Sequence, residues 1–196
     1  MAGRQFQQGD ALLLLDVQRD FFEGGTTPVP DGEEIIPVLN DWISDARERR
    51  IPIIAVRDWH SAYHSSFRDV GGEWPVHCVQ DTPGSFFHPA LRLPHDAIIV
   101  SKGTAFDDTC HSAFRHTGLA NFLRERGIRR LWIGGVIEEI GVRQTVEEAR
   151  EAGFEVCVIE DGVRPLDPRA EADARDAMRQ AGARLERRPE PVHTSD

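Results

Sequence analysis

The chain has 196 residues, of which 40% are hydrophobic and 29% charged, and its formal net charge is −10 at pH 7. This length suits one domain with a single core, and the composition is that of a globular protein rather than a disordered one. The negative charge excludes a nucleic-acid partner, and because no apolar run approaches the roughly 20 residues of a membrane-spanning helix, we expect no membrane partner either.

Short apolar runs alternate with amphipathic segments along the chain. Residues 11–17 form an apolar run (ALLLLDV) that is typical of a strand buried on both faces. Apolar side chains between Ile35 and Ala46 recur at helical spacing, and a second strand is predicted over 51–57. Further strands are predicted at 97–100, 131–134 and 154–159, and further helices at 119–126, 139–152 and 170–181. We therefore expect a doubly wound parallel sheet between two helical layers, in one domain over 1–186 with a flexible tail over 187–196.

Polar side chains stand where the predicted strands end. Asp16 lies at the carboxyl end of the first strand, Asp58 follows the second, and Lys102 follows the third. Because ligands of doubly wound sheets bind outside the carboxyl ends of the strands, we expect these side chains and the turn over 134–141 to share one site. The segment 61–94 lacks a clear period and is long for a connection, which is typical of a functional loop.

Asp58 and His60 form a D-x-H pair at a strand end, where side chains two residues apart share a face about 6–7 Å apart at the backbone. This spacing suits two ligands of one divalent metal ion. A third ligand from the next loop, His77, would leave coordination positions open, as in catalytic sites, and His64 and His88 compete for that place. Nitrogen and carboxylate ligands favour zinc, with iron and manganese as alternatives. From the pair alone, a histidine that only caps a loop is the alternative.

Asp16 and Lys102 are candidates for proton transfer. They come from the ends of different predicted strands, and a carboxylate beside an ammonium group in a closed pocket can exchange protons near neutral pH. A plain ion pair is the alternative for two such residues.

Several short motifs together resemble one known family. In chain order they are Asp16-Val17-Gln18-Arg19-Asp20-Phe21, Gly24-Gly25, Asp58-Trp59-His60, His64-Ser65-Ser66-Phe67, GGEWPVHC over 71–78 and Ser101-Lys102-Gly103. From about Ala11 to Ile159, they are similar in order and spacing to the nicotinamidase (pyrazinamidase) branch of the isochorismatase-like hydrolases. The resemblance implies an isochorismatase-like α/β/α fold and a role in NAD metabolism. It further implies hydrolysis of the C–N bond of a small planar carboxamide and assembly into a homo-oligomer.

The resemblance also implies roles for individual residues. The implied catalytic residues are Asp16 and Lys102, and the implied metal ligands are Asp58, His60 and His77. His64 is then left with a role in its loop. A flat substrate ring would lie between aromatic walls, and the implied substrate contacts are Phe21, Trp74, Val136 and Ile137.

The turn after the fourth main strand departs from the family pattern. In the family this turn carries a glycine, a cis peptide and then a nucleophilic cysteine that opens a helix. Here Gly135 is the turn glycine and Gly141 occupies the nucleophile position, while Thr145 keeps the expected register. Gly141 has no side chain, so no aspartate-activated thiolate can attack a substrate from this position. Backbone N–H groups at this helix N-terminus could still stabilise an oxyanion.

Three explanations compete for Gly141. In the first, the chain is a nicotinamidase-like amide hydrolase that binds its ligand and turns over little. In the second, metal-activated water hydrolyses the amide without a covalent intermediate, and Asp16 or Glu138 handles protons. In the third, the chain resembles isochorismatases, in which an aspartate protonates a vinyl ether; we rank this below the amide hypothesis because the turn and the metal ligands differ. A catalytically silent binder of nicotinamide-like metabolites is a fourth hypothesis, from another class.

The three cysteines offer no substitute nucleophile. Cys78 belongs to the metal loop, Cys110 to a connecting segment and Cys157 to a strand interior. Their odd number and the lack of a C-x-x-C spacing argue against a disulfide framework, so reduced thiols are expected. The N-terminal residues show no secretory signal, and we therefore expect a cytoplasmic protein.

Overall fold

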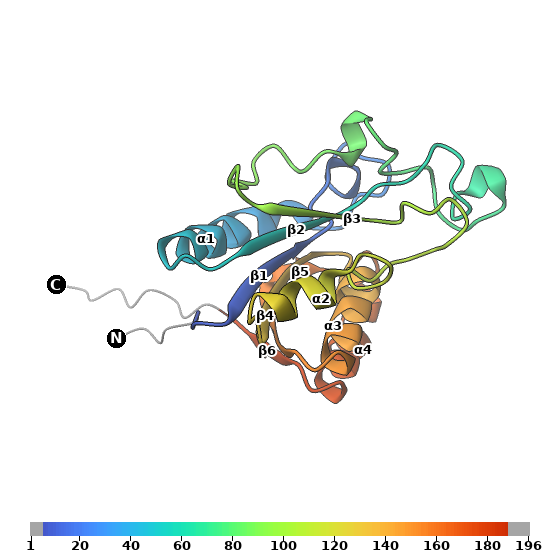
Figure 1. Ribbon diagram of the computed structural model, residues 1–196. Coiled ribbons are helices and arrows are strands. Elements are labelled where there is room, and N and C mark those ends of the chain that lie inside the picture. The colour runs from blue at the N-terminus through green and yellow to red at the C-terminus, as the bar shows by residue number, and fades with distance from the viewer. Residues whose placement is uncertain (1–5, 188–196) are drawn as a thin grey trace.

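The computed structural model describes residues 6–187. Its strands form one parallel sheet with the order β3-β2-β1-β4-β5-β6, and helices cover both faces (Figure 1). The strands are β1 (Asp10–Leu15), β2 (Ile53–Asp58), β3 (Ile98–Lys102), β4 (Arg130–Val136), β5 (Glu155–Arg164) and β6 (Arg184–Glu186). The helices are α1 (Ile35–Glu48), α2 (Leu119–Glu125), α3 (Arg143–Glu151) and α4 (Glu171–Gln180). The predicted doubly wound α/β architecture is confirmed.

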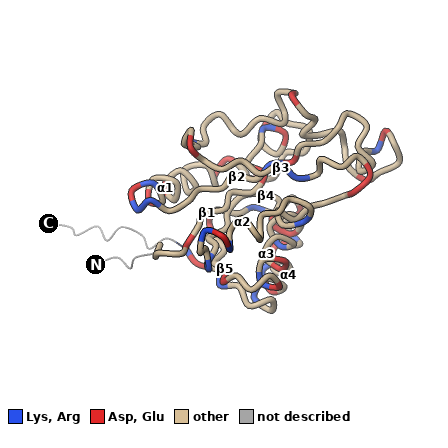
Figure 2. The backbone as a smooth tube through the Cα atoms, in the orientation of Figure 1, with Lys and Arg blue, Asp and Glu red and all other residues tan. Residues whose placement is uncertain are grey.

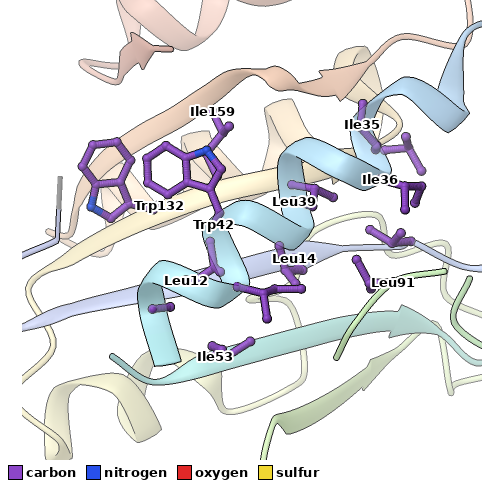
Figure 3. Packing of buried hydrophobic residues seen from close by; sticks show 14 of the residues in the cluster. Leu12, Leu14, Ile35, Ile36, Leu39, Trp42, Ile53, Leu91, Trp132 and Ile159 are labelled. Atoms are coloured by element: carbon purple, nitrogen blue, oxygen red, sulfur yellow. The ribbon is translucent and has the colours of Figure 1, made fainter. Parts of the chain in front are cut away.

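The alternation of side chains along β1 explains why its sequence is apolar throughout. Leu12 and Leu14 point to the face covered by α1, where they join a cluster that includes Trp42 (Figure 3). Leu13 and Leu15 belong to the cluster on the other face, together with apolar residues of α2, α3 and α4. Because both faces are buried, no polar residue alternates with the leucines.

The helices are polar on their outer sides. Acidic and basic residues are interspersed along α3 and α4, as Figure 2 shows. Helices that bury one stripe and expose the rest have this pattern, which accounts for much of the chain's charge. No helix within residues 6–187 is both long enough and apolar enough to cross a membrane.

Two features of the fold differ from the sequence-based expectation. The strand β6 was not predicted, because three residues with two charged side chains carry no periodic signal. The predicted helix over 139–152 begins only at Arg143, since Glu138–Val142 form a wide π-helical turn, η5. The single-domain boundary at 186 stays a prediction, and of the expected tail, residues 188–196 lie outside the described part of the chain.

Candidate metal and active site

A pocket lies at the carboxyl ends of the central strands. Every site residue predicted from the sequence lines it except Val136. These residues are Asp16, Phe21, Asp58, His60, Trp74, His77, Lys102, Ile137 and Gly141. The side chain of Val136 is instead buried in the hydrophobic core, and its role as a substrate contact stays a prediction.

Asp58, His60 and His77 meet in this pocket, and each offers one ligand atom within 4.8 Å of the others. All three side chains are buried. The Nδ1 atoms of His60 and His77 lie 3.0 and 2.8 Å from the carbonyl oxygens of Gly103 and Pro75, respectively. An Nδ1–H that donates to a carbonyl leaves the lone pair on Nε2, and both Nε2 atoms face Asp58 Oδ2, at 3.7 and 4.0 Å. This donor set fits a divalent cation.

The other two candidate ligands are separated from this group. His88 lies 3.2 Å from Glu33 and is not part of the pocket. His64 lines the pocket and its ring stands 4.3 Å from that of His60, but its Nδ1 is 2.7 Å from Ser66 Oγ. It lies outside the group of three whose ligand atoms converge.

Gln18 positions Asp58, and sequence reasoning gave it no role. Its side-chain amide donates to the carbonyl of Asp58 over 2.8 Å, and its Oε1 accepts from the Asp58 N–H over 2.7 Å. The side chain is fully buried, so the two hydrogen bonds face little competition from water. The signal available in the sequence was its place two residues after Asp16 in a recognised motif.

The ammonium group of Lys102 lies between two carboxylates that also line the pocket. Its Nζ lies 2.9 Å from Asp16 Oδ2 and 2.6 Å from Asp58 Oδ1, and all three side chains are buried. Lys102 is also the only lysine in the chain. Burial alone would lower its pKa, but the two carboxylates raise the pKa above its usual value.

The two carboxylates differ in acidity. Burial raises the pKa of Asp16 to about 7, an effect that Lys102 only partly offsets. Burial opposes ionisation of Asp58 as well, but Lys102 and the two neighbouring histidines hold the pKa of Asp58 below its usual range. Asp16 can therefore exchange a proton near neutral pH while Asp58 stays ionised. The Oδ1 atom of Asp16 has no hydrogen-bond partner among residues 6–187.

Gly141 faces Asp16 across the pocket. A Cβ built on Gly141 would lie 3.3 Å from Asp16 Oδ2, 3.4 Å from the carbonyl oxygen of His111 and 3.8 Å from that of Val136. The backbone of Gly141 does not have a positive φ, so a larger residue could adopt its conformation. Before this turn, the peptide bond between Val136 and Ile137 is cis.

Glu138 is not available for proton transfer in the pocket. Its side chain is fully buried and accepts a hydrogen bond from Arg175 Nε over 2.7 Å, and it does not line the pocket. The ion pair ties η5 to α4 and satisfies the buried charge. The hypothesis that Glu138 handles protons is therefore wrong.

The segment between β3 and α2 brings two further groups to the pocket. His111 lines it with its ring 6.0 Å from that of Trp74, and burial together with the charge of Lys102 lowers the pKa of His111 to about 4. Cys110 lines the pocket as well, but burial raises the pKa of its thiol, which donates to the carbonyl of Ser112 over 3.3 Å. A protonated thiol in such a contact is a poor nucleophile. No period or motif in this irregular segment pointed to either residue.

Comparison with known proteins shows that the chain is similar in sequence and in fold to one family of hydrolases. Residues 10–189 match the isochorismatase domain family. The chain is 35% identical to a nicotinamidase of Escherichia coli, over 89% of this chain and 93% of that protein, and 31% identical to a nicotinamidase/pyrazinamidase of Mycobacterium tuberculosis, over 89% and 97%. The crystal structure of a pyrazinamidase of Pyrococcus horikoshii in complex with zinc superposes with a TM-score of 0.89 and 44% identity, over 91% of this chain and 99% of that one.

Proposed function

Because the chain belongs to the isochorismatase family, we propose that this hydrolase acts on the C–N bond of a small planar carboxamide, as in the conversion of nicotinamide to nicotinate. The observation that carries the proposal is the buried array of Asp16, Lys102 and Asp58 at the floor of a pocket with aromatic walls. The similarity to nicotinamidases supports the substrate class. A homo-oligomer and a cytoplasmic location stay predictions.

We propose that Asp58, His60 and His77 hold the divalent ion. The orientation of both Nε2 atoms toward Asp58 supports this assignment, and the zinc complex of the similar pyrazinamidase favours zinc. A divalent ion bound there supplies a Lewis acid and lowers the pKa of coordinated water.

The remaining pocket residues would bind the substrate and move protons. Phe21 and Trp74 would hold the flat ring between them. Asp16, with its pKa near 7, would take a proton from the attacking water and return it to the amide nitrogen. The water oxygen bonds to the carbonyl carbon, the C–N bond breaks, and the carboxylic acid and ammonia leave.

The absence of a side chain at Gly141 determines the rate of amide hydrolysis that we expect. Since this position has no thiol, no thioester can form, and the reaction would lack the gain from splitting one difficult step into two easier ones. We therefore expect slow turnover.

Two alternative functions are each favoured by one specific observation. A carboxyl group with a pKa near 7 is partly protonated at neutral pH and could protonate a vinyl ether, which would give isochorismatase-type chemistry at Asp16. A site without a nucleophilic side chain at Gly141 could bind nicotinamide-like metabolites and release them unchanged.

The experiment measures ammonia release from nicotinamide, and cleavage of isochorismate, by the zinc-loaded chain, the chelator-treated chain and the Gly141→Cys variant. Calorimetry with nicotinamide measures binding in parallel. Slow ammonia release that Gly141→Cys accelerates supports the proposal. Vinyl-ether cleavage would favour the isochorismatase-type function. Ring binding without turnover, in both the parent chain and the Gly141→Cys variant, would favour the silent binder. Absence of both ring binding and turnover would refute the carboxamide proposal.

A further inference from the structure

The loop that carries His77 follows an unusual backbone path. Cys78, the next residue, has a φ of 45°, a left-handed conformation that is uncommon for a residue with a side chain. Such a conformation persists only where the surrounding structure holds it. The N–H group of Cys78 belongs to the peptide bond that follows His77, so a contact that fixes this N–H group also fixes the backbone of His77.

The peptide groups on both sides of Cys78 are held by other segments. The carbonyl of Cys78 accepts a 3.0 Å hydrogen bond from the N–H group of His60, just beyond the end of β2. The N–H group of Cys78 donates to Asp20 Oδ2 over 2.7 Å. Asp20 is buried, and a hydrogen bond from a backbone N–H group to a buried carboxylate is stronger than one between neutral groups. The carboxylate of Asp20 therefore ties this loop to the segment that follows β1.

The side chain of Asp20 has little freedom to move. The N–H group of Thr27 donates to the carbonyl of Asp20 over 2.8 Å, which holds the backbone. The backbone of Gly84 lies directly against the side chain, because a Cβ at Gly84 would collide with the carboxyl group. On the next residue, the ring of Phe21 packs with its centroid 5.6 Å from that of the His77 ring. Asp20 is therefore a fixed acceptor beside the loop.

We propose that Asp20 is a positioning residue for the metal site, and that its hydrogen bond with Cys78 keeps Nε2 of His77 directed at the ion. The inference rests on the metal site proposed above. The Nδ1 atom of His77 contacts the carbonyl of Pro75 within the same loop, so this contact cannot fix the loop relative to the other ligands. The hydrogen bond to Asp20 comes from a different segment and can do so. A ligand that is already in place loses less conformational freedom when the ion binds, which raises the affinity.

The zinc affinities of two Asp20 variants test the proposal. Asp20→Ala removes the acceptor, whereas Asp20→Asn keeps an acceptor oxygen in a side chain of the same size. We expect Asp20→Ala to lower zinc affinity by about 10–100-fold, as does the loss of other groups that orient metal ligands. Asp20→Asn should lose only about fivefold or less, because a neutral acceptor still forms the hydrogen bond, although a weaker one. Competition with a chromogenic chelator measures each dissociation constant.

Gly84→Ala tests the same hydrogen bond without changing Asp20. The new methyl group would displace the carboxylate, so zinc affinity should fall by about tenfold or more. In the double variant with Asp20→Ala, the methyl group occupies the space of the removed carboxylate, and the further loss should be about twofold or less. Gly32→Ala is the matched control and should leave zinc affinity unchanged. Gly32 also lacks a positive φ, and its Cβ would make an ordinary contact of 3.4 Å with Phe22.

Asp10→Ala controls for a general loss of stability. Asp10 is buried and accepts from the N–H group of Gln7 over 2.8 Å, but it begins β1 at the amino end of the strand, outside the site pocket. Circular dichroism checks that each variant folds. Co²⁺ in place of zinc reports the geometry of the ligands through its visible absorption spectrum. We expect this spectrum to change in Asp20→Ala and to stay the same in Asp10→Ala.

The outcomes separate this role of Asp20 from the metal site itself. If the parent chain binds zinc and Asp20→Ala binds it equally well, or if Asp20→Asn loses as much affinity as Asp20→Ala, the positioning role is refuted and the metal site stands. An unchanged Co²⁺ spectrum in Asp20→Ala refutes the role as well. If Asp20→Ala does not fold, the comparison of Gly84→Ala with Gly32→Ala decides. If the parent chain binds no zinc, the metal site fails and the role of Asp20 fails with it.

Discussion

Lys102 donates a 2.6 Å hydrogen bond to Asp58, and so joins a proposed metal ligand to the proposed proton carrier Asp16. The ammonium group is the counter-charge for two buried carboxylates. We expect Lys102→Met to lower the free energy of unfolding of the chelator-treated protein by about 3–5 kcal/mol, because it leaves buried charges without a partner. Urea denaturation measures the change.

The control for this variant is Arg179→Met. Arg179 pairs with Asp176 on the exposed surface of α4, and removal of an exposed pair costs about 0–1 kcal/mol. Equal losses in the two variants would contradict the structural role of Lys102.

Removal of either histidine that we propose as a ligand should weaken metal binding. We expect His60→Ala and His77→Ala to lower zinc affinity by at least about 10–100-fold, since each substitution removes one of three converging ligand atoms. Metal analysis of the purified variants and competition with a chromogenic chelator measure the change. His116→Ala is the control because this side chain is exposed, and unchanged zinc content in His77→Ala would refute the assignment.

A thiol at position 141 should restore the missing nucleophile. The new Cβ would lie 3.3 Å from Asp16 Oδ2, so the sulfur of Gly141→Cys enters the pocket beside the group that would deprotonate it. We expect ammonia release from nicotinamide to rise at least about tenfold and to become sensitive to iodoacetamide. In the double variant Gly141→Cys/Asp16→Asn the gain should disappear, and a gain that survives would exclude Asp16 as the base.

His111 should make the metal-free protein sensitive to mild acid. Its pKa falls from 6.5 to about 4 in the folded state, because burial and Lys102 oppose its positive charge. Below pH 6.5 the unfolded chain therefore binds the proton first, and the stabilisation present above pH 6.5 is lost as the pH falls toward 4. The loss should be about 2 kcal/mol after allowance for partial exposure.

Urea denaturation between pH 7 and 4.5 measures this effect by comparison with His111→Phe, which keeps a ring in the pocket and cannot titrate. The slope of stability against pH should be smaller in the variant. Parallel curves for the parent and His111→Phe would show that His111 does not titrate as proposed.

Gly135 is required by close packing between β4 and β1. Its φ of 127° is unfavourable for other residues, and a Cβ there would collide with the backbone of Leu15. We expect Gly135→Ala to destabilise the fold by about 3 kcal/mol or more. Gly118→Ala tests the conformational part alone, because Gly118 has a φ of 73° with open space around it, and should cost only about 1–2 kcal/mol. Thermal unfolding of both variants decides whether the steric contact matters.

The architecture could be predicted from the sequence because its signals are local. An apolar run such as 11–17 marks a strand buried on both faces, and polar residues at the ends of such runs lie on one edge whenever the strands are parallel. For the same reason Asp16, Asp58 and Lys102 were expected together, and they lie within hydrogen-bond distance through Lys102. The strand β6 is too short to contain an apolar run that would predict it.

The surroundings of Gly141 were decided only by the tertiary structure. Glu138 stands three residues before Gly141, but its side chain pairs with Arg175 of α4 and turns away from the pocket. His111 and Cys110 enter the pocket from an irregular segment, where no period relates position in the chain to direction in space. The sequence alone determined that no thiol stands at position 141. Only packing between distant segments brought the carboxylate of Asp16 and the carbonyl oxygen of His111 close to this position.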